Sequence, residues 1–151
     1  MIKYYTGNIE PEDGTIFVFG SNPEGRHGAG AAKIAMTKFG AIYGQGEGRQ
    51  GNSYAIPTKD LRVKENKGYR SISPDNIVSS IINFYNYANQ HPDLKFKIAY
   101  RNTTERSLNG YTGIEMIAMF IYAASGFGSI PENVYISKEW FDTGLFYDRQ
   151  V

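Results

Sequence analysis

Residues 15–39 read TIFVFGSNPEGRHGAGAAKIAMTKF, a strand pattern that runs into a glycine-rich loop and then into a helix pattern. Thr15–Phe19 consists of β-branched and aromatic residues, which is typical of a buried strand. Ala31–Phe39 is rich in helix-forming residues and stops at Gly40, so we expect a helix there. Because ligands of open α/β sheets bind beyond the carboxyl ends of the strands, the intervening loop Gly25–Gly30 is in the right place for a binding site.

Strand and helix patterns alternate along the rest of the chain. Further strands are expected at Ser53–Ile56, Lys95–Tyr100 and Asn133–Ile136, and loops at Ala41–Gly51, Leu61–Ile72 and Arg101–Gly110. Ser73 is the expected N-cap of a helix that runs to about Gln90, and Thr112 begins another helix with a capping box. The alternation favours a mainly parallel sheet with helices on both faces, in one domain that spans residues 1–151.

Apolar residues at helical spacing predict which face each of these two helices buries. The expected buried stripe of the first helix is Ile77, Ile81, Phe84, Tyr85 and Ala88. The expected stripe of the second is Ile114, Ile117, Ala118 and Ile121.

Composition excludes several classes of protein. The chain has 151 residues, of which 41% are hydrophobic and 21% charged, as is ordinary for a globular protein. It has no apolar run of the roughly 20 residues that a membrane span needs, and its first residues do not resemble a signal peptide, so a cytoplasmic location and no membrane partner are expected. Cysteines are absent and His27 and His91 are far apart, so no metal site is expected. The net charge of +1 does not indicate a duplex-DNA binder.

The glycines of the first loop favour an anionic ligand. They let backbone amides approach a ligand closely, and the N-terminus of the following helix attracts negative charge, so a diphosphate fits. Gly25, Gly28 and Gly30 do not have dinucleotide-fingerprint spacing, and the Gly-Lys-Ser/Thr ending of a Walker loop is missing. The alternative is that the loop is only a tight connection between strand and helix.

Three motifs carry a resemblance to a known family. Phe19–Asn22 followed by Arg26–Ala32 resembles the first ligand loop of macrodomains. Tyr54–Lys59 resembles the strand-plus-lysine element of the macrodomain branch that strips ADP-ribose from DNA bases or acidic side chains. Leu108–Thr112 resembles the end of the family's other phosphate loop. The chain is most similar, from about residue 16 to residue 136, to small macrodomain-like proteins of bacteria and their phages.

The resemblance implies a three-layer α/β/α macrodomain-like fold with a mixed, mostly parallel sheet. It also implies a ligand of the ADP-ribose type, with Lys59 as the catalytic residue of an ADP-ribosyl hydrolase and no cofactor. The expected ligand-binding residues of the first loop are Gly20, Ser21, Asn22, Arg26, His27, Gly28, Ala29 and Gly30. Those expected in the second loop are Arg106, Ser107, Leu108, Asn109, Gly110 and Tyr111.

The second loop departs from the family pattern. Glu105 and Ser107 stand where glycines are expected, and Asn109 stands where some lysine-type hydrolases have an aspartate. Because an amide cannot shuttle a proton as a carboxylate does, these departures weaken the case for hydrolysis more than the case for binding. Glu105 or Asp60 could supply the acid.

Two classes of function follow from these motifs. The first is a hydrolase that removes ADP-ribose from a modified nucleic-acid base or an acidic side chain, with nucleic acid a partner only as that modified substrate. The second is a non-catalytic module that captures ADP-ribose-type or other nucleotide signals, which by analogy would suit a phage counter-defence protein. Each candidate residue also has a simpler interpretation. Lys59 would then be a surface lysine, and His27 a hydrogen-bonding or exposed loop residue.

Overall fold

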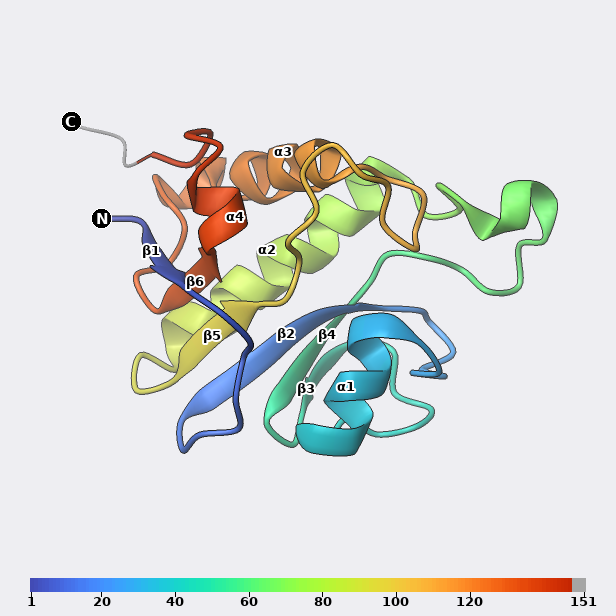
Figure 1. The fold of residues 1–151 in the computed structure, drawn as a ribbon, viewed down its shortest axis with the longest axis horizontal. Helices are drawn as coiled ribbons and strands as arrows, with labels where there is room; N and C mark the ends of the chain where they lie inside the picture. The colour runs from blue at the N-terminus through green and yellow to red at the C-terminus, as the bar shows by residue number, and fades with distance from the viewer. Residues whose placement is uncertain (148–151) are drawn as a thin grey trace.

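A six-stranded sheet forms the centre of the computed structural model, which describes residues 1–147. The strand order is β1-β6-β5-β2-β4-β3, and every neighbouring pair is parallel except β3 and β4. The strands are β1 Lys3–Tyr5, β2 Thr15–Ser21, β3 Gly48–Gln50, β4 Ser53–Pro57, β5 Lys95–Ile98 and β6 Val134–Ser137. The expected mixed, mostly parallel sheet is therefore confirmed (Figure 1).

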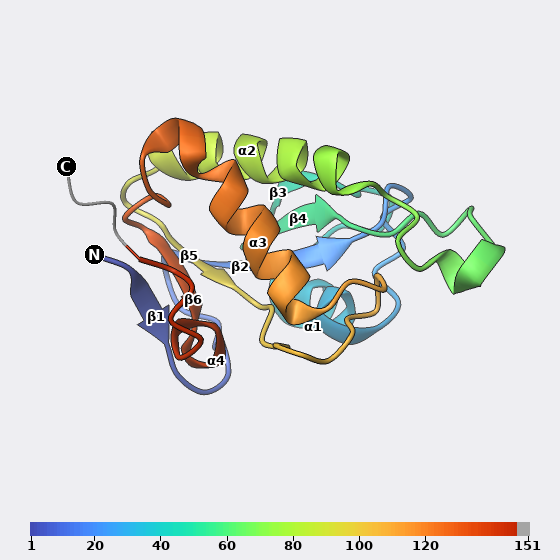
Figure 2. The same cartoon turned by 90° about the horizontal axis from the view of Figure 1, so that it is seen from above.

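Helices cover both faces of this sheet. Helix α1, Gly30–Lys38, lies on one face, and α2, Pro74–Gln90, and α3, Gly113–Ala123, lie on the other (Figures 1 and 2). The remaining helices are α4 Lys138–Phe141 and the short 3-10 turns η1 Glu65–Gly68 and η2 Ser125–Phe127. This arrangement agrees with three α/β/α layers.

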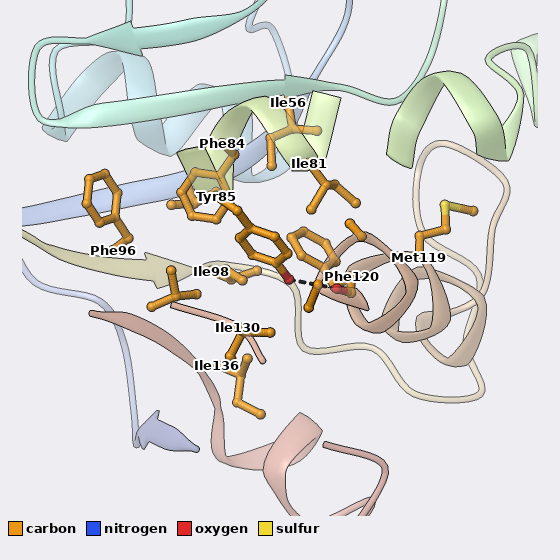
Figure 3. Close-up of a cluster of buried hydrophobic side chains, with 14 of the residues drawn as sticks. Ile56, Ile81, Phe84, Tyr85, Phe96, Ile98, Met119, Phe120, Ile130 and Ile136 are labelled. Atoms are coloured by element: carbon orange, nitrogen blue, oxygen red, sulfur yellow. Dashed lines mark hydrogen bonds between the residues drawn. The ribbon is translucent and has the colours of Figure 1, made fainter. Parts of the chain in front are cut away.

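Two apolar clusters hold the layers together. The larger lies between the sheet and α2 and α3, where Tyr85 donates a hydrogen bond of 2.8 Å to the Phe120 carbonyl oxygen (Figure 3). The smaller packs α1 against the opposite face, with Phe39 stacked on Phe17 at 4.5 Å between ring centroids. Central strand β2 is buried on both faces, as its continuous apolar run predicted.

The buried stripe predicted for α2 is confirmed at all of its positions, whereas the stripe predicted for α3 is largely wrong. Ile117 is buried as predicted, but Ile114 and Ala118 are exposed and Ile121 is half-buried. The other side chains that α3 buries are Met116, Met119, Phe120 and Ala123. The Phe120 ring meets Tyr85 of α2 and Trp140 of α4, and these contacts decide which side of α3 faces inward.

Two strands were missed. β1 has only three residues, and β3 lies inside the segment Ala41–Gly51 that was predicted to be a loop. The aromatic C-terminal segment contains α4, whose Trp140 is fully buried. Among residues 1–147, no helix has the length and apolar character needed to cross a bilayer, and no cluster of three or more His, Asp or Glu side chains offers a metal site.

Candidate functional site

A cavity of about 650 Å³ opens where the parallel strands β2, β4 and β5 end at their carboxyl termini. Its volume lies in the range of nucleotide-sized ligand sites, and its position is that predicted for an open α/β sheet. The predicted site residues that line it are Gly20, Ser21, Asn22, Arg26, Gly28, Ala29, Gly30, Lys59, Ser107, Leu108 and Asn109.

The N-terminus of α1 forms one wall of this cavity. Its N-cap, Ala29, has no side chain able to accept hydrogen bonds from the first helical amides. Gly30, Ala31 and Ala32 all line the cavity, and the Lys33 amide donates to the Ala29 carbonyl oxygen at 3.3 Å. An α-helix leaves its first amides without intrahelical acceptors, so this wall offers donors and a partial positive charge to a ligand.

The first ligand loop is braced from behind by the second glycine-rich segment, residues 41–51. The Gly44 amide donates to the Gly25 carbonyl oxygen at 2.8 Å, and the Ser21 hydroxyl donates to the Gly46 carbonyl oxygen. Gly25 has φ +68, and a Cβ on it would lie 2.4 Å from the Gln45 amide nitrogen, so only glycine fits there. The segment therefore holds the ligand loop from outside the cavity.

His27 belongs to this brace and does not line the cavity. Its side chain is fully buried against the Phe19 ring, and Nε2 lies 3.2 Å from the Gln50 Oε1 atom. Gln50 Oε1 also accepts a bond of 2.7 Å from the Ile42 amide. The prediction that His27 lines the ligand site is therefore wrong, because its ring points away from the cavity and into the protein interior.

Four lining residues are in contact with one another: Gly20, Thr58, Tyr100 and Asn109, and we call this group the floor of the cavity. The Tyr100 Oη atom lies 3.2 Å from Thr58 Oγ1 and accepts a bond of 3.3 Å from Asn109 Nδ2. Burial raises the pKa of Tyr100 to about 12, although the hydrogen bonds of Thr58 and Asn109 act in the opposite direction.

Lys59 follows β4 and lines the cavity. Its Nζ atom lies 5.4 Å from the centroid of the Tyr69 ring, and Arg106 approaches the same ring at 4.9 Å. The neighbouring Asp60 carboxylate is engaged by Arg62, whose hydrogen bonds lower the pKa of Asp60 to about 2. Asp60 is therefore an ion-pair partner of Arg62 and does not line the cavity.

Part of the second loop faces away from the cavity. Glu105 is exposed, and its carboxylate accepts a bond of 2.9 Å from the Thr103 amide, which lowers its pKa. Tyr111 is buried and donates to the Ile72 carbonyl oxygen at 2.7 Å. Arg106 and Gly110 do not line the cavity either. Glu105 and Arg106 are thus exposed and Gly110 and Tyr111 are buried, while Ser107, Leu108 and Asn109 line the cavity.

The charge of the cavity is one-sided. Arg26, Lys59 and Arg101 line it, and none of its lining residues within the described part of the chain carries a carboxylate. Arg101 is held in place by the Gly7 carbonyl oxygen and by Glu139, whose Oε2 lies 3.7 Å from its guanidinium. Such a wall favours an anionic ligand.

Several lining residues were not predicted: Thr58, Leu61, Ala99, Tyr100, Arg101 and Asn102. Most of them directly follow β4 or β5. The rule that ligands bind beyond the carboxyl ends of parallel strands could have found them, had it been applied to every strand and not only to β2.

No protein-family model matches this sequence, and no curated protein does.

Proposed function

We propose that this protein binds ADP-ribose or a related ADP-ribosyl nucleotide, with Lys59 as the catalytic residue for release of ADP-ribose from a modified nucleic-acid base or acidic side chain. The observation that carries the binding proposal is the uncapped N-terminus of α1 in the wall of a cavity lined by three cationic residues and no carboxylate. Backbone amides at a helix start and flanking cations are what a diphosphate needs.

The motifs that resemble macrodomains meet around this cavity. Asn22 and Arg26 come from the first motif, Lys59 from the second and Leu108 from the third, and all four line the same space. Leu108 reaches across to the first loop, since its Cδ1 atom would lie 2.9 Å from a Cβ on Gly30. Segments distant in sequence are thus brought together as the resemblance requires.

In the proposed reaction, the neutral amine of Lys59 attacks the anomeric carbon of the terminal ribose. A nitrogen–carbon bond forms, the bond to the base or carboxyl oxygen breaks, and the leaving group takes up a proton. Water then releases ADP-ribose and restores the amine. Lys59 is suited to this role by its place in the cavity, next to Thr58 on the floor.

Capture without turnover is the second candidate function, and a specific observation favours it. Neither Glu105 nor Asp60 lines the cavity, and Asn109 presents an amide there. Protonation of the leaving group would have to come from a group other than a carboxylate of the lining residues. A binding module needs no such group.

Calorimetry and product analysis distinguish these proposals. Wild-type protein is titrated with ADP-ribose, then incubated with an ADP-ribosylated DNA oligonucleotide and with a peptide ADP-ribosylated on glutamate. Saturable binding supports the nucleotide site, and release of ADP-ribose that Lys59→Ala abolishes supports hydrolysis. Lys64→Ala is the matched control, because Lys64 is an exposed lysine of the adjacent loop that does not line the cavity and whose Nζ donates to the Leu61 carbonyl oxygen.

Three outcomes separate the alternatives. Tight binding without release by wild type establishes capture and overturns hydrolysis. Release that Lys59→Ala leaves unchanged removes Lys59 from the mechanism. Failure of wild type to bind ADP-ribose, ADP and AMP overturns the nucleotide site itself.

A further inference from the structure

Three neutral polar side chains share the floor of the cavity, in contrast to its cationic walls. Thr58 follows β4, Tyr100 follows β5, and Asn109 comes from the second loop. Tyr100 Oη is their common partner, 3.2 Å from Thr58 Oγ1 and 3.3 Å from Asn109 Nδ2. Thr58 lies in the Tyr54–Lys59 motif and Asn109 in the Leu108–Thr112 motif, but Tyr100 belongs to neither, so the fold brings the cluster together.

The fold makes room for the Tyr100 hydroxyl and fixes its ring. A Cβ on Gly20 would lie 2.1 Å from Tyr100 Oη and 3.1 Å from Thr58 Oγ1, so the hydroxyl occupies space that any other residue at position 20 would fill. The ring stacks on Trp140, with 5.8 Å between centroids and 10° between planes. The hydroxyl is thereby held at one point of the floor.

The hydrogen-bonding pattern leaves a donor for a ligand. Asn109 Oδ1 accepts a bond of 2.9 Å from the Tyr111 amide, which turns the Asn109 Nδ2 group toward Tyr100. Tyr100 Oη therefore accepts from Asn109, and it shares one further bond with Thr58. The two hydroxyls carry two protons but share one bond, so one O–H is not used within the cluster and can serve a ligand.

We propose that the Thr58–Tyr100–Asn109 cluster binds hydroxyl groups of the terminal sugar of the nucleotide, with Tyr100 as a specificity-determining residue. This inference rests on the proposed binding of an ADP-ribose-type ligand, and it assigns the sugar end of that ligand to the floor beside Lys59.

The chemistry of the two parts of the cavity supports this assignment. Phosphate oxygens are bound best by cations and by amides at a helix start, both of which lie on the walls. A sugar hydroxyl both donates and accepts, and hydroxyl and amide side chains match that pattern without an excess of charge. The raised pKa of Tyr100 keeps its hydroxyl protonated, so it stays a donor over the whole ordinary pH range.

The test compares two ligands and two matched variants by calorimetry. ADP-ribose carries the terminal ribose and ADP lacks it. Tyr100→Phe removes only the cluster's hydroxyl, and Tyr85→Phe makes the same chemical change in a buried tyrosine that bonds the Phe120 carbonyl oxygen and does not line the cavity. We expect Tyr100→Phe to weaken ADP-ribose binding roughly tenfold and ADP binding less than about twofold. Tyr85→Phe should leave both affinities unchanged.

Thr58→Val provides a second, nearly isosteric variant should Tyr100→Phe fold poorly, and it should show the same selective loss. Equal affinity of wild type and both cluster variants for ADP-ribose would overturn the inference and leave the proposed function intact. An equal loss for ADP would also overturn it, because the hydroxyl would then serve the part of the ligand that both share. If wild type binds neither ligand, the proposed function itself fails.

Discussion

Two loops line the cavity: the first lies between β2 and α1, and the second lies between β5 and α3. They are held in place in different ways. The first is braced by another segment through Gly25–Gly44 and His27–Gln50 contacts, and it ends at a helix with no side-chain cap. The second is held by a bond within the loop, from the Ser107 amide to the Tyr111 carbonyl oxygen at 2.8 Å, and by contacts with residues 69 and 70. The first therefore presents backbone donors to a ligand, and the second presents side chains.

The largest effect is expected from breaking the brace at Gly25. Gly25→Ala forces a side chain onto a residue with φ +68 and a Cβ to within 2.4 Å of the Gln45 amide nitrogen. We expect the free energy of unfolding to fall by roughly 3 kcal/mol, seen as a melting temperature lower by roughly 10 °C. ADP-ribose binding should become undetectable at concentrations that saturate wild type.

Gly28→Ala is the matched control for this substitution. Gly28 lines the cavity, and no atom lies within 4 Å of a Cβ built on it. Its melting temperature should stay within about 1 °C of wild type, while the added methyl group weakens ADP-ribose binding about tenfold by keeping the ligand from the backbone. A large loss of stability in Gly28→Ala, or none in Gly25→Ala, would contradict the proposal that Gly25 supports the fold of the loop while Gly28 serves ligand binding.

An intermediate effect is expected at Gln50, which joins the brace to the ligand loop. Gln50→Leu removes the acceptor for the Ile42 amide and for the buried His27 Nε2, and leaves both donors without it. The free energy of unfolding should fall by roughly 2 kcal/mol, and ADP-ribose affinity by about fivefold. Hydrogen exchange should show faster exchange of the amides at residues 26–32 than in wild type.

Gln45→Leu serves as its control, because the Gln45 side chain donates to the Glu47 and Arg49 carbonyl oxygens, within the same segment and not to the ligand loop. Exchange at residues 26–32 that rises equally in both variants would show that Gln50 has no specific role in the loop.

The smallest effect is expected at Glu105, one of the two carboxylates that the sequence offers as the acid of a hydrolase. Glu105 is exposed, points away from the cavity and bonds the Thr103 amide. Glu105→Gln keeps an oxygen acceptor, so the free energy of unfolding should change by less than about 0.5 kcal/mol and ADP-ribose affinity by less than about twofold. A tenfold change in binding or in ADP-ribose release would return Glu105 to the site.

The contrast between the loops also explains what the sequence could reveal. A glycine-rich loop between a strand and a helix can be recognised from the local sequence alone. Gly28 and Gly30 of that loop line the cavity. The second loop is set by distant contacts, such as the bond from the Arg70 amide to the Asn109 carbonyl oxygen and the packing of Gly110 against Tyr69. No local pattern reveals such contacts. Tyr111, which was expected to bind the ligand, is instead buried and donates to the Ile72 carbonyl oxygen.

The other differences between the expected and the observed site concern which way a side chain points and where a strand ends. His27 stands between two cavity residues in the chain, yet its φ of +48 turns its side chain into the brace. The expected strand Lys95–Tyr100 ends at Ile98, and that early end lets Tyr100 reach the floor. The mostly parallel sheet, the buried face of α2 and the glycine loop could be predicted from the sequence pattern, whereas the buried face of α3 and the orientation of single loop residues are set by tertiary packing.

The most direct test of the account is the crystal structure of the protein soaked with ADP-ribose. The account predicts diphosphate oxygens within hydrogen-bond distance of the Gly30, Ala31 and Ala32 amides, with the terminal ribose over Tyr100. A diphosphate bound outside this cavity, or an empty cavity at a saturating concentration of ligand, would contradict it.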